Sequence, residues 1–153
     1  MSAAQKVADA AVASIGFLLD EGFCLMALAA ALEPLRMANQ LAGCTLYRWQ
    51  TLSLDGRARR ANNGMWVTPD RALGAVDKLY GLILCRGDDE AQAHRPELEC
   101  QLCDLARAGV FLGAPGLEPM LQMIGGRHGR MLTRAISEGL AFEPLPTPSQ
   151  LLH

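Results

Sequence analysis

The runs Ala13-Ser-Ile-Gly-Phe-Leu-Leu19 and Leu79-Tyr-Gly-Leu-Ile-Leu-Cys85 are short, almost wholly apolar and end in polar segments. The first run is followed by Asp20-Glu-Gly22 and the second by Arg86-Gly-Asp-Asp89. Continuous apolar runs of this length are typical of strands that are buried on both faces of a parallel sheet. We therefore expect two buried strands, each running into a loop at its carboxyl end.

Helical patterns separate and follow these strands. Residues 23–40 are rich in Ala, Leu and Met and apolar almost all round in the first three turns, which predicts a helix packed on more than one side. Pro34 lies inside this stretch, so the helix either begins late or kinks there. Apolar residues that recur at helical spacing predict three further helices. The helix over 96–108 is expected to end at Gly109 and the helix over 117–124 at Gly125-Gly126, and the third covers 131–140.

Further strand signals complete the pattern. Residues 47–53 alternate and are β-rich, and Asn62-Asn-Gly64 predicts a small hairpin between 57–60 and 65–67. Residues 110–112 predict a short strand. Strands that alternate with helices over the first 112 residues indicate right-handed βαβ units and an open, mostly parallel α/β sheet.

Composition excludes several classes of protein. The 153 residues are half apolar and give about one domain, and 14 basic against 16 acidic residues do not suit a domain that grips nucleic acid by itself. The longest apolar run, residues 23–32, is too short to span a membrane, which takes roughly 18 residues. The apolar run near the N-terminus ends in Asp20-Glu-Gly22 without a cleavage site, so we expect a cytoplasmic protein rather than a secreted one.

Metal and redox sites are disfavoured by spacing. Cys100-Gln-Leu-Cys103 lies in the middle of a predicted helix, whereas a thioredoxin-like pair lies at a helix N-terminus, so structural cysteines are favoured over a redox or zinc site. The three histidines are dispersed, and no metal or cofactor is expected. Gly126-Arg-His-Gly-Arg130 could bind an anion, although an exposed solvated turn is favoured.

In a sheet of this kind, ligands bind beyond the carboxyl ends of the strands. The loops to inspect are therefore Asp20-Glu-Gly22, Arg86-Gly-Asp88 and Gly113-Ala-Pro-Gly116, and we expect them to converge. A nucleophile elbow would place Cys or Ser in the third loop, which contains neither.

Six short motifs occur in a fixed order along the chain. They are Ile15-Gly-Phe-Leu-Leu, Gly22-Phe23, Ala29-Ala-Ala-Leu-Glu-Pro-Leu-Arg-Met-Ala-Asn39, Leu46-Tyr-Arg-Trp49, Ser53-Leu-Asp-Gly56 and Ala61-Asn-Asn-Gly64. In this order they resemble the ligand-sensing N-terminal domain of AraC-type transcriptional regulators, which is similar to PfpI-like and class I glutamine amidotransferase-like proteins. The resemblance implies a flavodoxin-like α/β fold, an open, mostly parallel sheet with helices on both faces. The resemblance covers residues 14–113, within a domain expected over 1–143 and followed by a proline-rich tail over 144–153.

The sequence also departs from that family. Its members continue from the position of Gly113 into an elbow of the form Gly-Gly-x-Cys-x-Gly, whereas here Gly113-Ala-Pro-Gly116 joins two halves directly. This implies an internal deletion near 113–116 and an incomplete sheet. The related enzymes carry a carboxylate in the first helix near the position of Ala27, so a cysteine hydrolase or hydratase using Cys24 or Cys85 is only an alternative.

The resemblance implies a non-enzymatic sensor that binds a small metabolite, of amino-acid or quaternary-amine type, and acts through a homodimer without contacting DNA itself. A degenerate, non-functional fragment is the other alternative. Arg86 could pair with a carboxylate, and Asp88 or Glu33 could face a cation. With the loop residues Glu21 and Gly87, these make up the expected ligand site. The apolar helix from Phe23 suits either the dimer interface or burial within one subunit.

Overall fold

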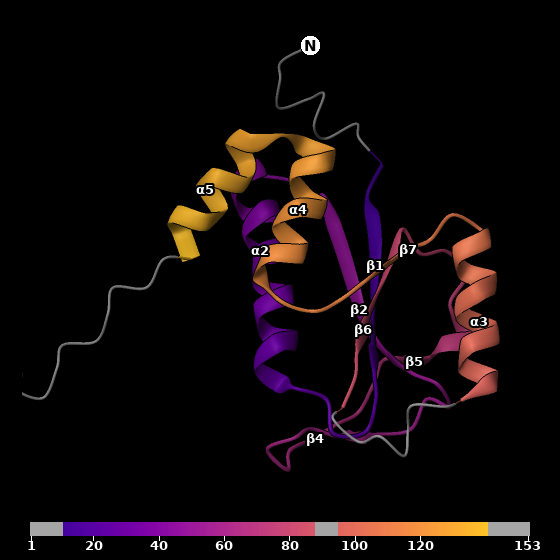
Figure 1. Cartoon of the computed structure of the whole chain (residues 1–153). Coiled ribbons are helices and arrows are strands. Elements are labelled where there is room, and N and C mark those ends of the chain that lie inside the picture. Colours follow the sequence, from indigo (N-terminus) through magenta and orange to yellow (C-terminus); the bar gives the residue numbers. More distant parts are fainter. Residues whose placement is uncertain (1–10, 88–94, 141–153) are drawn as a thin grey trace, which may run out of the picture.

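A computed structural model describes residues 11–87 and 95–140, which form a sheet covered by helices on both faces (Figure 1). The strand order is β5-β2-β1-β6-β7, and every neighbouring pair is parallel. The predicted α/β class is therefore confirmed, and among the described residues the main sheet is wholly parallel.

The two apolar runs form the middle of this sheet. Strand β1 (Ala13–Leu19) lies between β2 (Tyr47–Ser53) and β6 (Gly81–Cys85). Ile15 and Phe17 of β1 have no exposed surface, nor does Ile83 of β6. On the opposite face Leu18 of β1 and Leu82 of β6 are buried as well, so these two strands are covered on both sides, as the continuous apolar sequence predicts.

Helix α2 (Leu25–Ala42) runs through Pro34 and ends at Gly43, which adopts the left-handed conformation with φ of 68°. The helix begins nine residues before the proline, so the late start that the sequence left open is excluded. Its buried residues Leu28, Ala31, Leu35 and Ala38 face the core, while Met26 is 77% exposed. The helix contacts β2 as well as the two C-terminal helices, so it is packed on more than one side, as predicted, and the exposed Met26 of the first turn is the exception.

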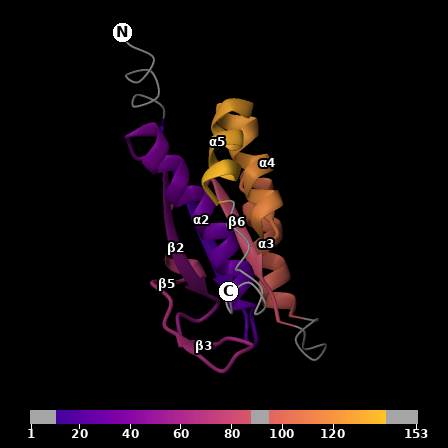
Figure 2. The ribbon, with the colours of Figure 1, turned by 90° about the vertical axis from the view of Figure 1, so that its left-hand side faces the viewer.

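Helices α4 (Leu117–His128) and α5 (Arg130–Leu140) cover the same face of the sheet as α2 (Figure 2). The prediction that Gly125-Gly126 ends α4 is wrong, because the helix continues to His128 and stops at Gly129, where φ is 90°. A Cβ at Gly125 would lie 3.2 Å from the Thr133 methyl group, so this glycine allows close packing on α5 rather than ending the helix.

The opposite face is covered by α3 (Pro96–Arg107), which presents Leu98 and Leu102 to the sheet (Figure 1). Its first residue is a proline, which suits the first turn of a helix because an amide there needs no partner within the helix. The observed ends are within one residue of the prediction.

The edges of the sheet are short. The predicted hairpin forms from β3 (Arg59–Arg60) and β4 (Trp66–Val67), which pair antiparallel. Strand β5 (Arg71–Ala72), followed by a 3₁₀ turn over Leu73–Ala75, is an unpredicted edge strand beside β2. Strand β7 (Phe111–Gly113) forms the other edge, and three residues connect it to α4.

Candidate functional site

The carboxyl ends of β1, β6 and β7 lie at one end of the sheet, where the predicted loops meet. The Asp20 amide donates to the carbonyl oxygen of Cys85 at 3.0 Å, and the Gly22 amide donates to that of Arg60 at 2.8 Å. Gly87 lies so close to the backbone of Glu21 that a Cβ would overlap the carbonyl oxygen of that residue. Glycine at position 87 is therefore required for the two loops to approach each other.

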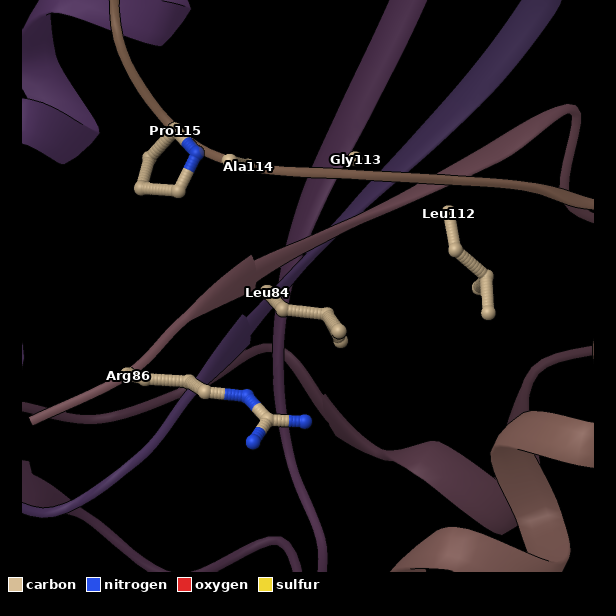
Figure 3. A pocket seen from close by; sticks show the side chains of 6 residues that line it. All are labelled: Leu84, Arg86, Leu112, Gly113, Ala114 and Pro115. Carbon is tan, nitrogen blue, oxygen red and sulfur yellow. The ribbon is translucent and has the colours of Figure 1, made fainter.

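An open depression of about 480 Å³ lies beside these loops. It is lined by Leu84, Arg86, Leu112, Gly113, Ala114 and Pro115, so the third loop also converges here (Figure 3). Leu84 and Leu112 pack on the same side of the sheet as α3 and give the depression an apolar floor. The sequence and the fold thus combine a guanidinium group with apolar surface at the end of the sheet where ligands are expected.

The Arg86 guanidinium is the charged group of this depression. Its side chain is exposed, and within residues 11–87 and 95–140 it makes no hydrogen bond or ion pair. Arginine presents its donors in a planar fork that matches the two oxygens of a carboxylate. The group is therefore available to an anionic ligand.

The described acidic residues of the expected ligand site, Glu21 and Glu33, do not line the depression. The Glu21 carboxylate accepts the Arg60 amide at 3.2 Å and so faces the hairpin. Glu33 lies in the middle of α2, where it is ion-paired with Arg36 at 2.7 Å, and this hydrogen-bonded partner holds the pKa of Glu33 below its ordinary value. The structure does not bring Glu33 to the depression, and Asp88 lies outside the described residues.

One ion pair at this end of the sheet was missed from the sequence. The Arg95 guanidinium donates to Asp20 Oδ1 at 2.9 Å, and both side chains are largely buried. It connects the end of β1 to the start of α3. The available signal was an aspartate directly after a buried strand, which needs a partner once it is shielded from water.

The Cys85 thiol is placed unfavourably for nucleophilic chemistry. Cys85 is buried, and burial, together with the nearby Cys24 thiol, raises its pKa to about 12. A thiol protonated at neutral pH is a poor nucleophile. Cys100 and Cys103 are free and exposed on α3, and the described part of the chain holds no group of three residues suited to a metal ion.

The predicted solvated turn around His128 is corrected by the structure. Arg127 and His128 form the last turn of α4 and are partly buried against the ring of Tyr47. They lie at the amino end of the sheet, away from the depression. Among the described helices, none is long and apolar enough to cross a membrane.

No family model matches the sequence, but curated proteins and solved structures are similar to it. The chain is 35% identical over 186 residues to the HTH-type transcriptional regulator GbdR of Pseudomonas aeruginosa, covering 85% of this chain and 51% of the relative. It thus spans about half the length of that relative. Because 85% of 153 residues is fewer than 186, several tens of residues in the aligned part of GbdR have no counterpart here.

Solved structures give the same fold. An AraC family transcriptional regulator from Pseudomonas putida superposes with a TM-score of 0.76 at 22% identity, covering 84% of this chain and 99% of that chain. DJ-1beta of Drosophila melanogaster superposes with a TM-score of 0.59 at 16% identity, covering 86% of this chain and 100% of that chain. The resemblance inferred from the sequence motifs is confirmed.

Proposed function

We propose that this chain, a DJ-1/PfpI-like α/β domain that matches the N-terminal part of AraC-family transcriptional regulators, is a non-enzymatic sensor of a small metabolite. The observation that carries the proposal is the Arg86 guanidinium, which has no partner among the described residues and lies in the depression where β6 and β7 end. No nucleophile lies in the loop 113–116 of the same depression. The site therefore suits binding rather than covalent chemistry.

The chemistry of the depression favours a ligand with a carboxylate and an apolar or methylated part. Arg86 would hold the carboxylate through two hydrogen bonds. Leu84, Leu112 and Pro115 would contact methyl or methylene groups. Glu21 and Gly87 belong to the adjoining loops. We assign the counter-charge for a cationic nitrogen to Asp88, which lies outside the described residues. An amino acid or a quaternary amine such as a betaine has these features.

In this proposal the sensor acts through a homodimer. We place the residues that GbdR has in excess at the junction 113–116, where β7 passes into α4. Met26, which is 77% exposed on the first turn of α2, is the apolar surface that we assign to a homodimer contact. Ligand binding in the cytoplasm would alter the dimer, and a separate DNA-binding unit would contact the promoter.

A thermal-shift screen against amino acids and betaines tests the proposal. A ligand at one hundred times its Kd stabilises the folded state by about 2.7 kcal/mol, which raises the Tm by roughly 5–10 °C for a domain of this size. Arg86→Gln should abolish the shift. Arg107→Gln removes the same charge from the exposed end of α3 and should retain it.

Two outcomes would contradict the proposal. An equal shift in the Arg86→Gln variant would place the ligand elsewhere. The absence of a cooperative melt in the parent chain would support the alternative of a degenerate fragment, because a chain without fixed packing unfolds without a sharp transition.

A further inference from the structure

The two edges of the main sheet differ in charge. Strand β5 lies at one edge, where Asp70 and Arg71 place exposed charges beside it. Strand β7 lies at the other edge, and the ten residues 108–117 around it carry no charged side chain. Proteins commonly protect a strand edge from pairing with another chain by placing charged side chains on it. The β7 edge lacks this protection.

The backbone of β7 presents a donor and an acceptor at this edge. The Phe111 amide donates to the carbonyl oxygen of Tyr80 at 3.0 Å, so Phe111 turns its backbone groups towards β6. Successive residues of a strand direct these groups to opposite sides, and the amide and carbonyl groups of Leu112 therefore point away from β6. Among the described residues no further strand lies beside β7 to pair with them.

The chain cannot supply the missing strand between β7 and the next helix. Only residues 114–116 separate β7 from α4, and Figure 1 shows this short connection. Three residues are too few for a strand that returns to lie beside β7, because a parallel neighbour needs a crossover of a dozen or more residues. A strand that covers this edge through such a connection is therefore excluded.

Apolar side chains accompany the free backbone groups. Phe111 is 44% exposed. A Cβ at Gly113 would lie 2.7 Å from Phe111 Cε1 and 3.1 Å from the Ile83 side chain, so the Phe111 ring covers that glycine on the α4 side of the sheet. Leu112 is half-buried on the opposite, α3 side. An exposed aromatic ring of this kind is typical of the surfaces through which proteins contact one another.

This edge is complementary to itself. When two copies of β7 run antiparallel about a two-fold axis at Leu112, each Leu112 amide donates to the carbonyl oxygen of the other Leu112. Phe111 of each copy then lies opposite Gly113 of the other copy. The two Phe111 residues become diagonal neighbours about 7–8 Å apart, which is within reach of aromatic side chains. Because residues 108–117 are uncharged, the pairing brings no like charges of this segment together.

We propose that β7 binds β7 of a second copy of this chain in this antiparallel register, which joins two five-stranded sheets into one continuous sheet. Leu112 and Ala114 also line the Arg86 depression, so the partner's strand would form a wall beside it. The contact is separate from Met26 on the first turn of α2. It requires no ligand and therefore does not depend on the proposed sensor function.

NMR of the full chain, with isotope-labelled and unlabelled copies mixed, tests the register. We expect intermolecular NOEs between the Hα atoms of Phe111 and Gly113, which face each other in the proposed pairing. The Leu112 amide should exchange with solvent at least tenfold more slowly at high protein concentration than at low concentration. Slow exchange at every concentration would mean that another segment of the chain covers the edge, and fast exchange at every concentration would mean that the edge stays unpaired. Either result would overturn the proposal.

Sedimentation equilibrium of matched variants locates the contact. Ala114→Lys adds a charge at an exposed position directly after β7, so it should weaken the dimer at least tenfold. Ala75→Lys makes the same change at an exposed alanine beside the β5 edge and should leave the affinity unchanged. Met26→Lys should keep the NOEs between Phe111 and Gly113. A dimer that survives Ala114→Lys and is lost in Met26→Lys would overturn the proposal, as would a parent chain that is monomeric at every concentration measured.

Discussion

Raising the pH from about 8 to about 10 should destabilise the protein through one buried thiol. Cys85 ends β6 with 2% of its surface exposed, and burial, helped by the nearby Cys24, raises the pKa of the thiol from 9.0 to about 12. The folded protein therefore keeps the proton at pH 10, whereas the unfolded chain begins to release it near pH 9. Because the unfolded state then binds fewer protons, the free energy of unfolding falls as the pH rises.

The size of the effect follows from the two pKa values. A single group removes about 1.4 kcal/mol of stability for each pH unit between them. Moving to pH 10, one unit above the unfolded value of 9.0, therefore costs about 1.4 kcal/mol. For a domain of this length the Tm should fall by roughly 3–6 °C.

Urea unfolding followed by circular dichroism at both pH values measures this loss. Cys85→Ala leaves a cavity and lowers stability at every pH, so the quantity to compare is the difference between the two pH values within each variant. That difference should nearly vanish in Cys85→Ala and persist in Cys100→Ala, which changes an exposed thiol on α3. An equal difference in both variants would refute the reasoning. Rapid alkylation of Cys85 in the folded protein at pH 8 would also refute it and revive the hydrolase alternative.

Two other predictions follow from burial. Met120 on α4 is fully buried, so Met120→Ala should cost about 2–5 kcal/mol in urea unfolding, whereas Met131→Ala, at a residue that is 89% exposed, should cost less than about 0.5 kcal/mol. Burial, and then the charge of Arg127, lowers the pKa of His128 below 6.5. The folded state resists protonation, so its stability is complete above about pH 6.5 and falls as the pH drops towards the folded pKa. Thermal melts from pH 8 to 5 should show this fall in the parent chain and a flatter profile in His128→Gln.

The middle of the fold could be predicted from the sequence because its signals are local. The bounds of β1 and β2 agree with the predicted runs, and α3 agrees within one residue, since a buried strand or an amphipathic helix carries its environment in its own pattern. Strand β5 was missed because two residues, Arg71 and Ala72, carry no periodicity. The end of α4 was misjudged because packing of Gly125 on Thr133 outweighs the low helix propensity of glycine.

The candidate site was predicted in part. The topology of a parallel sheet indicates which loops converge, and Arg86 does line the depression at that end. The ion pair between Asp20 and Arg95, 75 residues apart, depends on tertiary contact and leaves no local pattern. The same holds for Arg127 and His128, whose motif resembles a solvated turn until α4 packs them against Tyr47.

Locating a bound metabolite by NMR, with methyl-labelled leucines and the best compound from the thermal screen, would test the proposed sensor site directly. We expect the methyl signals of Leu84 and Leu112 to shift with increasing ligand, while those of Leu98 and Leu102 on the buried side of α3 change little. The Arg86→Gln variant should show no shift at any position. Shifts centred elsewhere, or shifts at Leu84 and Leu112 that survive in Arg86→Gln, would contradict the assignment of the sensor site.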